Sequence, residues 1–454
     1  MAKQSHERET LMGGTTLKVI GGTPLHGSVR AGGAKNASYK LMIASMLGYE
    51  ESRLLNLPGI SDVKMVGQVI RDLGGKVWTA GDHTLFINSS NLAQSSIGNQ
   101  YGEVSRASTM FIPPLLARFG HAEVPMPGGD KIGRRPLERH FDGLKKMGAK
   151  FVQRDDILEI STDTGLSGTN YRFEKNTHTG TETLIMAAVL AKGKTVLENA
   201  ALEPEIDDLI KFLNNMGAKV RRRAFRVIEI EGVERLGGAI HRVMPDRNEV
   251  VSYACAAIAS EGDVIIENAR HQDLEAFLEK LDEAGAGFEI GDYGIRFFYK
   301  GSLRSTDLTT EIHPGFMTDW QPLWATLICK AGGQSIIHET VSQNRFQYVE
   351  TLRQMGAKIE TFDPEVSDPE KAYNFNWRDN KPSDVHAVKI FGPTNFIGGE
   401  FIIHDLRAGA TTLLAAISAK GQTILHNVEQ IDRGYEQIDD KLKLMGANIE
   451  RLEE

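Results

Sequence analysis

Cysteine is scarce in this sequence, and its scarcity excludes some architectures. Only two of the 454 residues are cysteines, Cys255 and Cys329, and both fall in apolar stretches without metal-ligand spacing around them. A disulfide-rich fold and a cysteine-based zinc site are therefore excluded. Two unpaired thiols in apolar stretches are typical of a protein from a reducing compartment.

Long apolar runs and an excess of basic charge are also missing. No apolar run reaches the length of a membrane span, and the first ten residues lack the apolar core of a secretory signal, so we expect a cytoplasmic protein. Lysine and arginine total 52 against 60 acidic residues, a net charge of −8, which does not favour a nucleic-acid-binding surface. An anionic ligand would need basic residues gathered locally.

The sequence does contain a repeat. A short phrase recurs six times: polar residues, an apolar residue, Gly followed by Ala or Gly, and the start of a strand. The spacings between its glycines are 74, 69, 68, 71 and 90 residues. Each phrase is typical of a helix that ends at a glycine and is followed by a strand. The glycines are Gly74, Gly148, Gly217, Gly285, Gly356 and Gly446.

Two further features precede each phrase. A short apolar or β-branched run, such as KTVLEN or QTILHN, lies about eighteen residues upstream and predicts a strand. Before it comes a helix that is apolar nearly all round, as expected of a buried helix. The sequence therefore predicts six α/β units of buried helix, strand, outer amphipathic helix, strand and strand. The buried helices are expected from Asn36, Ala107, Thr181, Asn248, Asp319 and Ala408.

The longer last interval indicates an insertion of about twenty residues. Its expected place is 363–386, a polar segment that contains prolines. Such a composition predicts a surface loop.

The second unit departs most from the others. Its strand-to-helix connection, 125–140, is about five residues longer than its equivalents and reads PMPGGDKIGRRPLERH. Asp130, Lys131, Arg134 and Arg135 stand together there, before the next helix. A glycine-flanked loop with basic residues at a helix start suits anion binding, although a solvated loop with scattered charges is the alternative.

The starts of the buried helices collect charged residues beyond what capping requires. Lysine and arginine are unfavourable at helix N-termini, where the macrodipole is positive, so basic residues at several such places indicate a bound anion. Two more arginines lie at element boundaries, and together these residues indicate a pocket for a multiply charged anion. The residues at or near these helix starts are Lys35, Asn36, Arg106, His178, Thr179, Asp246, Arg247, Asp319 and Arg407, and the two further arginines are Arg345 and Arg433.

In these stretches the sequence resembles the UDP-N-acetylglucosamine enolpyruvyl transferases, or 1-carboxyvinyltransferases, across nearly the whole chain. The motifs that carry the resemblance occur in order along the chain. They are GGAKNA (32–37), SRAS (105–108), PGGDKIGRRP (127–136), ENAALEPEI (198–206), HPGFMTDWQ (313–321), QNRF (343–346), DLRAGA (405–410) and IDRGYE (431–436).

The resemblance implies a fold and a domain division. The fold is an inside-out α/β barrel of six βαβαββ-type repeats, in two similar three-repeat domains that close over the substrates. Residues 35–245 would form the first domain, and 1–34 with 246–454 the second, which would carry the insertion. The repeat count agrees, because the third unit ends just before residue 245.

The resemblance also implies an activity: transfer of the enolpyruvyl group of phosphoenolpyruvate to the 3-hydroxyl of UDP-N-acetylglucosamine, with release of phosphate. It proceeds through a tetrahedral ketal, and it is the first committed step of peptidoglycan precursor synthesis. The family's loop acid is usually a cysteine, and Asp130 stands in its place here. Asp319 matches the base that acts on the sugar hydroxyl. The family needs no cofactor, and no metal site is expected.

Further roles carry over residue by residue. Lys35 and Arg407 match catalytic residues. The expected phosphoenolpyruvate contacts are Lys35, Asn36, Arg135, Arg345, Arg407 and Arg433. The expected contacts of the nucleotide sugar are Asn36, Arg106, Arg135, Pro136, Leu137, Glu138, Arg139, His178, Thr179, Asp319 and Val341.

The chain departs from the family pattern in the part expected to bind the nucleotide. Glu138 and Arg139 stand in RPLERH, and Asn176 lacks the charge expected to meet the diphosphate. Two alternatives therefore stay open: an enolpyruvyl transferase with another acceptor, such as shikimate phosphate, and a non-catalytic paralogue that binds UDP-sugars. The retention of Lys35, Asp319, Arg407 and Arg433 favours an enzyme.

Overall fold

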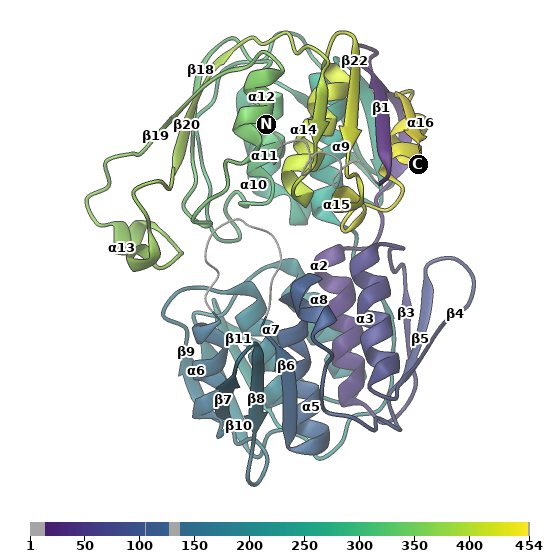
Figure 1. Ribbon diagram of the computed structural model, residues 1–454, viewed down its shortest axis with the longest axis vertical. Coiled ribbons are helices and arrows are strands. Elements are labelled where there is room, and N and C mark those ends of the chain that lie inside the picture. The colour runs from purple at the N-terminus through teal and green to yellow at the C-terminus, as the bar shows by residue number, and fades with distance from the viewer. Residues whose placement is uncertain (1–13, 105, 127–136, 453–454) are drawn as a thin grey trace, which may run out of the picture. The chain divides into compact units, whose positions relative to one another are not determined.

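The computed structural model describes residues 14–104, 106–126 and 137–452, without the side chains of residues 103, 104 and 106. The chain divides into two compact units (Figure 1). Among the described residues, the first unit comprises 32–126 and 137–244, and the second comprises 14–31 and 245–452. Each unit encloses a hydrophobic core of its own.

The first unit contains repeats one to three. Repeat one consists of α2 (Lys35–Ala44), β3 (Ser52–Leu55), α3 (Ser61–Asp72), β4 (Lys76–Thr79) and β5 (Thr84–Asn88). Repeat two consists of η2 (Arg106–Phe111), α5 (Ile112–Phe119), β6 (His121–Pro125), α6 (Glu138–Lys146), β7 (Lys150–Arg154) and β8 (Ile157–Ser161). Repeat three consists of α7 (His178–Ala188), β10 (Lys194–Glu198), α8 (Pro204–Asn215), β11 (Lys219–Ala224) and β12 (Val227–Glu231). The connecting elements are η1 (Ser45–Leu47), α4 (Gln100–Val104), β9 (Asn170–Arg172) and β13 (Ile240–Arg242).

The second unit contains repeats four to six. Repeat four consists of α9 (Arg247–Ala259), β14 (Asp263–Glu267), α10 (Glu275–Ala284), β15 (Gly287–Gly291) and β16 (Gly294–Phe298). Repeat five consists of α11 (Gln321–Ile328), β18 (Gly333–His338), α12 (Tyr348–Gln354), β19 (Lys358–Phe362) and β20 (Ala387–Gly392). Repeat six consists of α14 (Leu406–Ser418), β22 (Gln422–His426), α16 (Ile438–Leu444) and β23 (Asn448–Leu452). The other elements are β1 (Thr16–Ile20), β2 (His26–Arg30), η3 (His271–Asp273), β17 (Leu308–Thr309), α13 (Pro369–Ala372), η4 (Trp377–Asp379), β21 (Glu400–Ile402) and α15 (Glu429–Asp432).

Each repeat builds one small sheet with the same connectivity. In five sheets an edge strand pairs in parallel with the next strand, and two antiparallel strands follow, as in the order β17-β18-β20-β19. In the repeat-two sheet, β6-β8-β7, the parallel edge is reduced to a single bridge between Ser96 and Glu123. The predicted six-repeat α/β fold is therefore confirmed.

The N-terminal strands complete sheets of the second unit. Strand β1 lies between β22 and β23 and completes the sheet of repeat six. Strand β2 pairs in parallel with β14. The first unit is closed in a similar way, because β13, after repeat three, pairs with β3 of repeat one.

All six repeat glycines adopt the left-handed conformation. Their φ angles range from 81° at Gly285 to 104° at Gly217, and at each one a strand begins two residues later. A residue with a Cβ is strained in this region, so glycine is favoured where a helix turns directly into a strand. The prediction from the repeated phrase is confirmed.

The buried helices form the centre of each unit, and some of them begin a few residues away from the expected starts. In the second unit α9, α11 and α14 pack against one another (Figure 1). Trp320 and Trp324 are almost fully buried there. Asp319 does not open a helix, because α11 begins at Gln321 with a proline in its first turn. Repeat two enters its buried helix through the 3-10 turn η2, and α5 then begins with prolines in its first turn.

The predicted insertion lies where the sequence placed it, between β19 and β20. Most of its residues are exposed or partly exposed, as expected of a surface loop, but 363–386 also contains α13 and η4 and buries Tyr373, Phe375 and His386. The aromatic residues of this segment are interspersed with charged ones, so its average polarity did not indicate that any of its side chains would be buried. No helix in the described parts of the chain is long and apolar enough to cross a bilayer.

Candidate functional site

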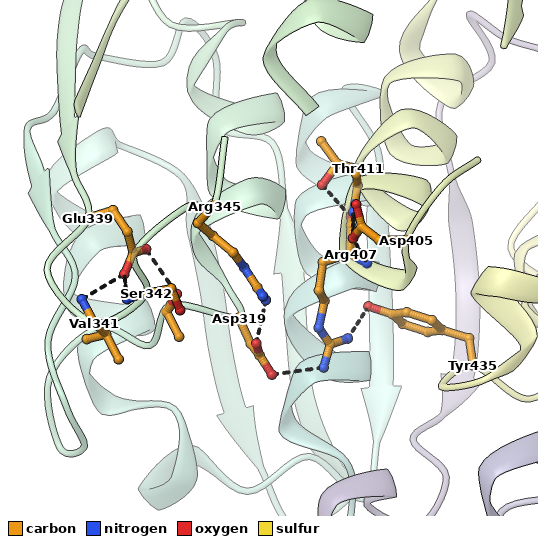
Figure 2. Close-up of polar contacts among 11 residues, drawn as sticks. Asp319, Glu339, Val341, Ser342, Arg345, Asp405, Arg407, Thr411 and Tyr435 are labelled. Atoms are coloured by element: carbon orange, nitrogen blue, oxygen red, sulfur yellow. Dashed lines mark hydrogen bonds and ion pairs between the residues drawn. The ribbon is translucent and has the colours of Figure 1, made fainter. Parts of the chain in front are cut away.

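A carboxylate between two buried arginines is the central feature of the second unit. Asp319, just before α11, accepts a hydrogen bond on Oδ1 from Arg345 Nη2 at 2.5 Å and one on Oδ2 from Arg407 Nη2 at 3.1 Å (Figure 2). The arginine side chains are 5% and 8% exposed, whereas the aspartate is 24% exposed. We call these three residues the Arg–Asp cluster. Its carboxylate is held in one orientation and still reaches solvent.

Arg407 is fixed by further contacts. Its Nη1 donates to the Tyr435 hydroxyl at 3.0 Å (Figure 2). That hydroxyl lies 2.7 Å from the Ser252 hydroxyl. Burial opposes the charge of Arg407, but Asp319 outweighs it and raises the pKa of the guanidinium above its ordinary value. Arg407 is therefore a permanently charged, oriented cation.

The start of α14 is capped, although it carries a basic residue in its first turn. Asp405 Oδ1 accepts hydrogen bonds from the backbone N–H groups of Arg407 and Ala408, both at 2.9 Å (Figure 2). The capping carboxylate satisfies the first amides of the helix and offsets the positive end of the helix dipole. Arg407 can then turn its side chain toward Asp319.

Arg345 lies on the loop between β18 and α12, whose shape depends on a buried carboxylate. Glu339 Oε1 accepts hydrogen bonds from the backbone N–H groups of Val341 and Ser342, both at 2.8 Å, and Oε2 accepts one from the Thr318 hydroxyl at 3.0 Å (Figure 2). Burial raises the pKa of Glu339, and the two amides oppose that rise. The carboxylate thereby fixes the loop that carries Val341.

Arg433 is the remaining arginine expected in the second unit. It is half-buried at the end of α15, two residues before Tyr435, and its Nη1 donates to Gln430 Oε1 at 3.5 Å. Tyr435 links the segment of Arg433 to Arg407.

In the first unit, Lys35 is the first residue of α2 and pairs with a carboxylate. Its Nζ lies 3.0 Å from Asp62 Oδ2, and the two side chains are 11% and 8% exposed. Asp62 lies in the first turn of α3, and Asn36 follows Lys35 in a half-buried position. The pairing leaves the lysine charge at the start of a buried helix, where an anion would be favoured.

A second ionic group links α2 to α7. Lys40 Nζ lies 2.5 Å from Glu182 Oε2 and 3.4 Å from His178 Nε2, and His178 Nε2 lies 3.2 Å from Glu182 Oε1. Lys40 and Glu182 are 2% and 0% exposed. Burial and Lys40 oppose the charge of His178, but Glu182 outweighs them and raises the pKa of the imidazole. His178 is thereby oriented at the start of α7.

The starts of α6 and α7 are joined by a direct contact. His140 Nε2 lies 2.8 Å from the Thr179 hydroxyl, and Arg139 accepts a hydrogen bond on its backbone oxygen from the Tyr171 hydroxyl at 3.3 Å. Leu137 is buried just before α6 and Glu138 is exposed at its start. The expected contacts at 137–139 and 178–179 are therefore neighbours in the fold.

Asn176 has a structural role. It is 4% exposed, and its Nδ2 donates to the backbone oxygen of Asn199 at 3.0 Å. This amide anchors the segment before α7.

Several expected residues lie outside the described residues. They are Asp130, Arg135 and Pro136, together with the side chain of Arg106. Within the described residues, no group of three or more His, Cys, Asp and Glu side chains is arranged to hold a metal ion.

Sequence reasoning missed several polar residues that shape these groups. Lys40 and Glu182 each interrupt an otherwise apolar helix, and a charge at such a place could have indicated a buried ion pair. Asp62, Glu339 and Tyr435 gave no comparable local signal, because their partners are distant in sequence or belong to irregular loops.

The fold is that of the enolpyruvyl transferases. It matches the crystal structure of the enolpyruvyl transferase NikO from Streptomyces tendae with a TM-score of 0.82 and 22% identity, over 97% of this chain and 99% of that one. It matches an EPSP synthase from Acinetobacter baumannii with a TM-score of 0.70 and 18% identity, over 96% of this chain and all of that one.

Sequence comparisons give the family. The family model for EPSP synthase (3-phosphoshikimate 1-carboxyvinyltransferase) matches residues 19–442. A UDP-N-acetylglucosamine 1-carboxyvinyltransferase of Protochlamydia amoebophila is 38% identical over 96% of this chain and 94% of its own length. The protein of the same name from Idiomarina loihiensis is 38% identical over 96% of this chain and 99% of its own length. The chain therefore belongs to the EPSP synthase family of transferases.

Proposed function

We propose that this chain is a UDP-N-acetylglucosamine 1-carboxyvinyltransferase. It transfers the enolpyruvyl group of phosphoenolpyruvate to the 3-hydroxyl of the nucleotide sugar and releases phosphate, at the entry to peptidoglycan precursor synthesis. The observation that carries the proposal is the Arg–Asp cluster, a partly exposed carboxylate held between two buried guanidinium groups. Relatives with that activity in their names, at 38% identity over nearly the whole chain, support it.

The reaction needs a base for the sugar hydroxyl and an acid for the methylene carbon. The hydroxyl oxygen attacks C2 of phosphoenolpyruvate while C3 takes up a proton, which gives a tetrahedral ketal. Loss of a proton from C3 and of phosphate from C2 then forms the enolpyruvyl ether. An acid–base pair of this kind contributes about 10²- to 10⁴-fold to a rate.

Asp319 is the proposed base. Two guanidinium groups fix the direction of both carboxylate oxygens. The same pairing weakens the carboxylate as a base. A phosphate or carboxylate group of the substrate would share the guanidinium charge, so Asp319 becomes a stronger base when the anionic substrate is bound.

The arginines are the proposed anion-binding groups. Phosphoenolpyruvate carries about three negative charges, and guanidinium groups bind carboxylate and phosphate with paired hydrogen bonds. Arg407 cannot move freely, because Tyr435 and Asp319 hold it from two sides. Pre-oriented donors of this kind stabilise the charge that develops in the ketal at no cost in reorganisation. Lys35 and Arg433 are proposed further contacts of the same substrate.

Asp130 is the proposed acid, in the loop at 127–136. Neither cysteine of the chain can serve as the acid in place of Asp130, because both are buried. Burial raises the pKa of Cys329 to about 12 and that of Cys255 higher still, so neither is a nucleophile near neutral pH. The two unpaired thiols also support our proposal that the protein is cytoplasmic.

The nucleotide-sugar contacts proposed in the first unit are the neighbouring residues 137–139 and 178–179, with Asn36. His178 is favoured as a donor to the diphosphate, because it is oriented by Glu182 whereas Asn176 is committed to Asn199. Val341, on the loop held by Glu339, is the proposed contact in the second unit.

The test is phosphate release from phosphoenolpyruvate with two acceptors in parallel. We expect release with UDP-N-acetylglucosamine and none with shikimate 3-phosphate. Release with shikimate 3-phosphate alone would reassign the acceptor. Binding of the nucleotide sugar without release under any condition would favour the non-catalytic paralogue and contradict the proposal.

A further inference from the structure

The 363–386 insertion is larger than the sheet requires. The corresponding hairpins in three other repeats are closed by two residues, as by Asp155 and Asp156 between β7 and β8. In repeat five the ladder is intact up to its last pair, Phe362 with Ala387, so the insertion leaves from a normal hairpin end. Sheet formation therefore does not explain it.

The insertion is folded around its own aromatic residues (α13 marks it in Figure 1). Tyr373 and Trp377 stack with ring centroids 4.9 Å apart, and Phe375 and His386 stack at 5.4 Å. His386 is fully buried, and its Nδ1 lies 2.5 Å from Asp363 Oδ1. A segment with a packed core can hold a neighbouring loop in place, which an unstructured loop cannot do.

The neighbour that it contacts is the loop between β18 and α12. Gln343 is 5% exposed, and its Nε2 donates to the Asp379 backbone oxygen and to Asp384 Oδ2, both at 2.7 Å. The Asn374 backbone N–H donates to the Thr340 backbone oxygen at 2.7 Å.

A further contact lies at the end of β18. The Tyr373 hydroxyl lies 3.1 Å from His338 Nε2, at the last residue of β18. The contacts of the insertion thus reach residues 338, 340 and 343, on both sides of Val341.

The contacted loop is the one that carries the proposed site. Residue 343 lies two residues before Arg345, whose Nη2 is bonded to Asp319. Glu339 holds the backbone amides of Val341 and Ser342. The insertion holds the same loop through Thr340 and Gln343, so two separate sets of contacts fix 339–345.

We propose that the insertion is a brace that pre-organises the 339–345 loop for the nucleotide sugar, with Gln343 and Asp384 as positioning residues. This inference rests on the proposed function for its substrate, but the contacts themselves do not depend on it. Without the brace the loop would become ordered only when the substrate binds. The entropy lost in that ordering weakens substrate binding and leaves the rate of the chemical step unchanged.

The experiment breaks one contact from each side. Gln343→Met removes the donor on the loop, and Asp384→Ala removes the acceptor on the insertion, outside the proposed substrate contacts. Each is expected to raise KM for UDP-N-acetylglucosamine about tenfold and to change kcat less than about twofold. Because Gln343→Met already removes the donor of the bond to Asp384, the double variant should be little worse than Gln343→Met alone.

Amide hydrogen exchange supplies a second readout that does not require turnover. Exchange in 339–345 should become about tenfold faster in both variants. The matched control is Lys371→Ala on α13, whose side chain is 86% exposed and pairs only locally with Asp368; it should leave both readouts unchanged.

The possible results distinguish a failure of the brace from a failure of the proposed function. If Asp384→Ala leaves both KM and exchange at the wild-type values, the brace is refuted, even if Gln343→Met is impaired. If the wild-type protein releases no phosphate but both variants show faster exchange, the proposed function fails and the brace stands as a structural element.

Discussion

Replacing Lys40 by methionine tests the buried ionic link between α2 and α7. The lysine is 2% exposed and lies 2.5 Å from Glu182, which is fully buried. Removal of one partner leaves a charge buried without its counterion, and such changes cost about 3–5 kcal/mol of stability. We expect a value near the lower end, because His178 still lies 3.2 Å from the carboxylate.

Urea unfolding followed by circular dichroism measures the effect. With an m-value of about 3 kcal/mol per molar urea, the midpoint should fall by about 1 M or slightly more. The double variant Lys40→Met, Glu182→Met should recover to within about 1 kcal/mol of wild type, because apolar residues of similar volume replace a buried pair with little cost.

A surface pair in the same unit is the control. Lys219 and Glu231 lie 2.7 Å apart with side chains 60% and 62% exposed, so Lys219→Met should cost less than about 1 kcal/mol. The reasoning is refuted if Lys40→Met is no worse than this control, or if the double variant is as unstable as the single one.

Three further predictions concern the site and its charges. Asp319→Asn should lower kcat about 10²- to 10⁴-fold in a phosphate-release assay, and near-normal turnover would exclude the base role. The pKa of His178 is raised by Glu182 above 6.5, so its contribution to stability is complete below about pH 6.5 and is lost as pH rises through the folded value. Glu182→Gln should remove that pH dependence in urea titrations between pH 6 and 9, and an unchanged profile would contradict the assignment. The enzyme should resist fosfomycin, which alkylates a loop thiol, and Asp130→Cys should gain time-dependent inactivation; rapid inactivation of the wild-type enzyme would be inconsistent with an aspartate in the loop.

The repeat could be predicted because its signals are local. A glycine in the left-handed conformation between a helix and a strand gives the same sequence pattern at Gly148 and Gly446. Buried helices are recognisable from their apolar composition. The charged residues at the helix starts were visible for the same reason. The resemblance then supplied the roles of Asp319 and Arg407.

Long-range pairing could not be predicted in this way. The edge strands are short, and β17 spans only Leu308–Thr309, so no periodic pattern reveals them. The contact between Lys40 and Glu182 joins residues far apart in sequence, and the aromatic core of 363–386 depends on side chains that a polar average conceals. In each case the determining interaction is tertiary.

The most direct test of the central claim is the identity of the product. The protein is incubated with phosphoenolpyruvate and UDP-N-acetylglucosamine, and the nucleotide sugar is analysed by mass spectrometry, with Asp319→Asn in parallel. We predict a nucleotide sugar that has gained one enolpyruvyl group, formed together with an equal amount of phosphate, and little of it with the variant. An unmodified nucleotide sugar, or the same yield from Asp319→Asn, would contradict the account.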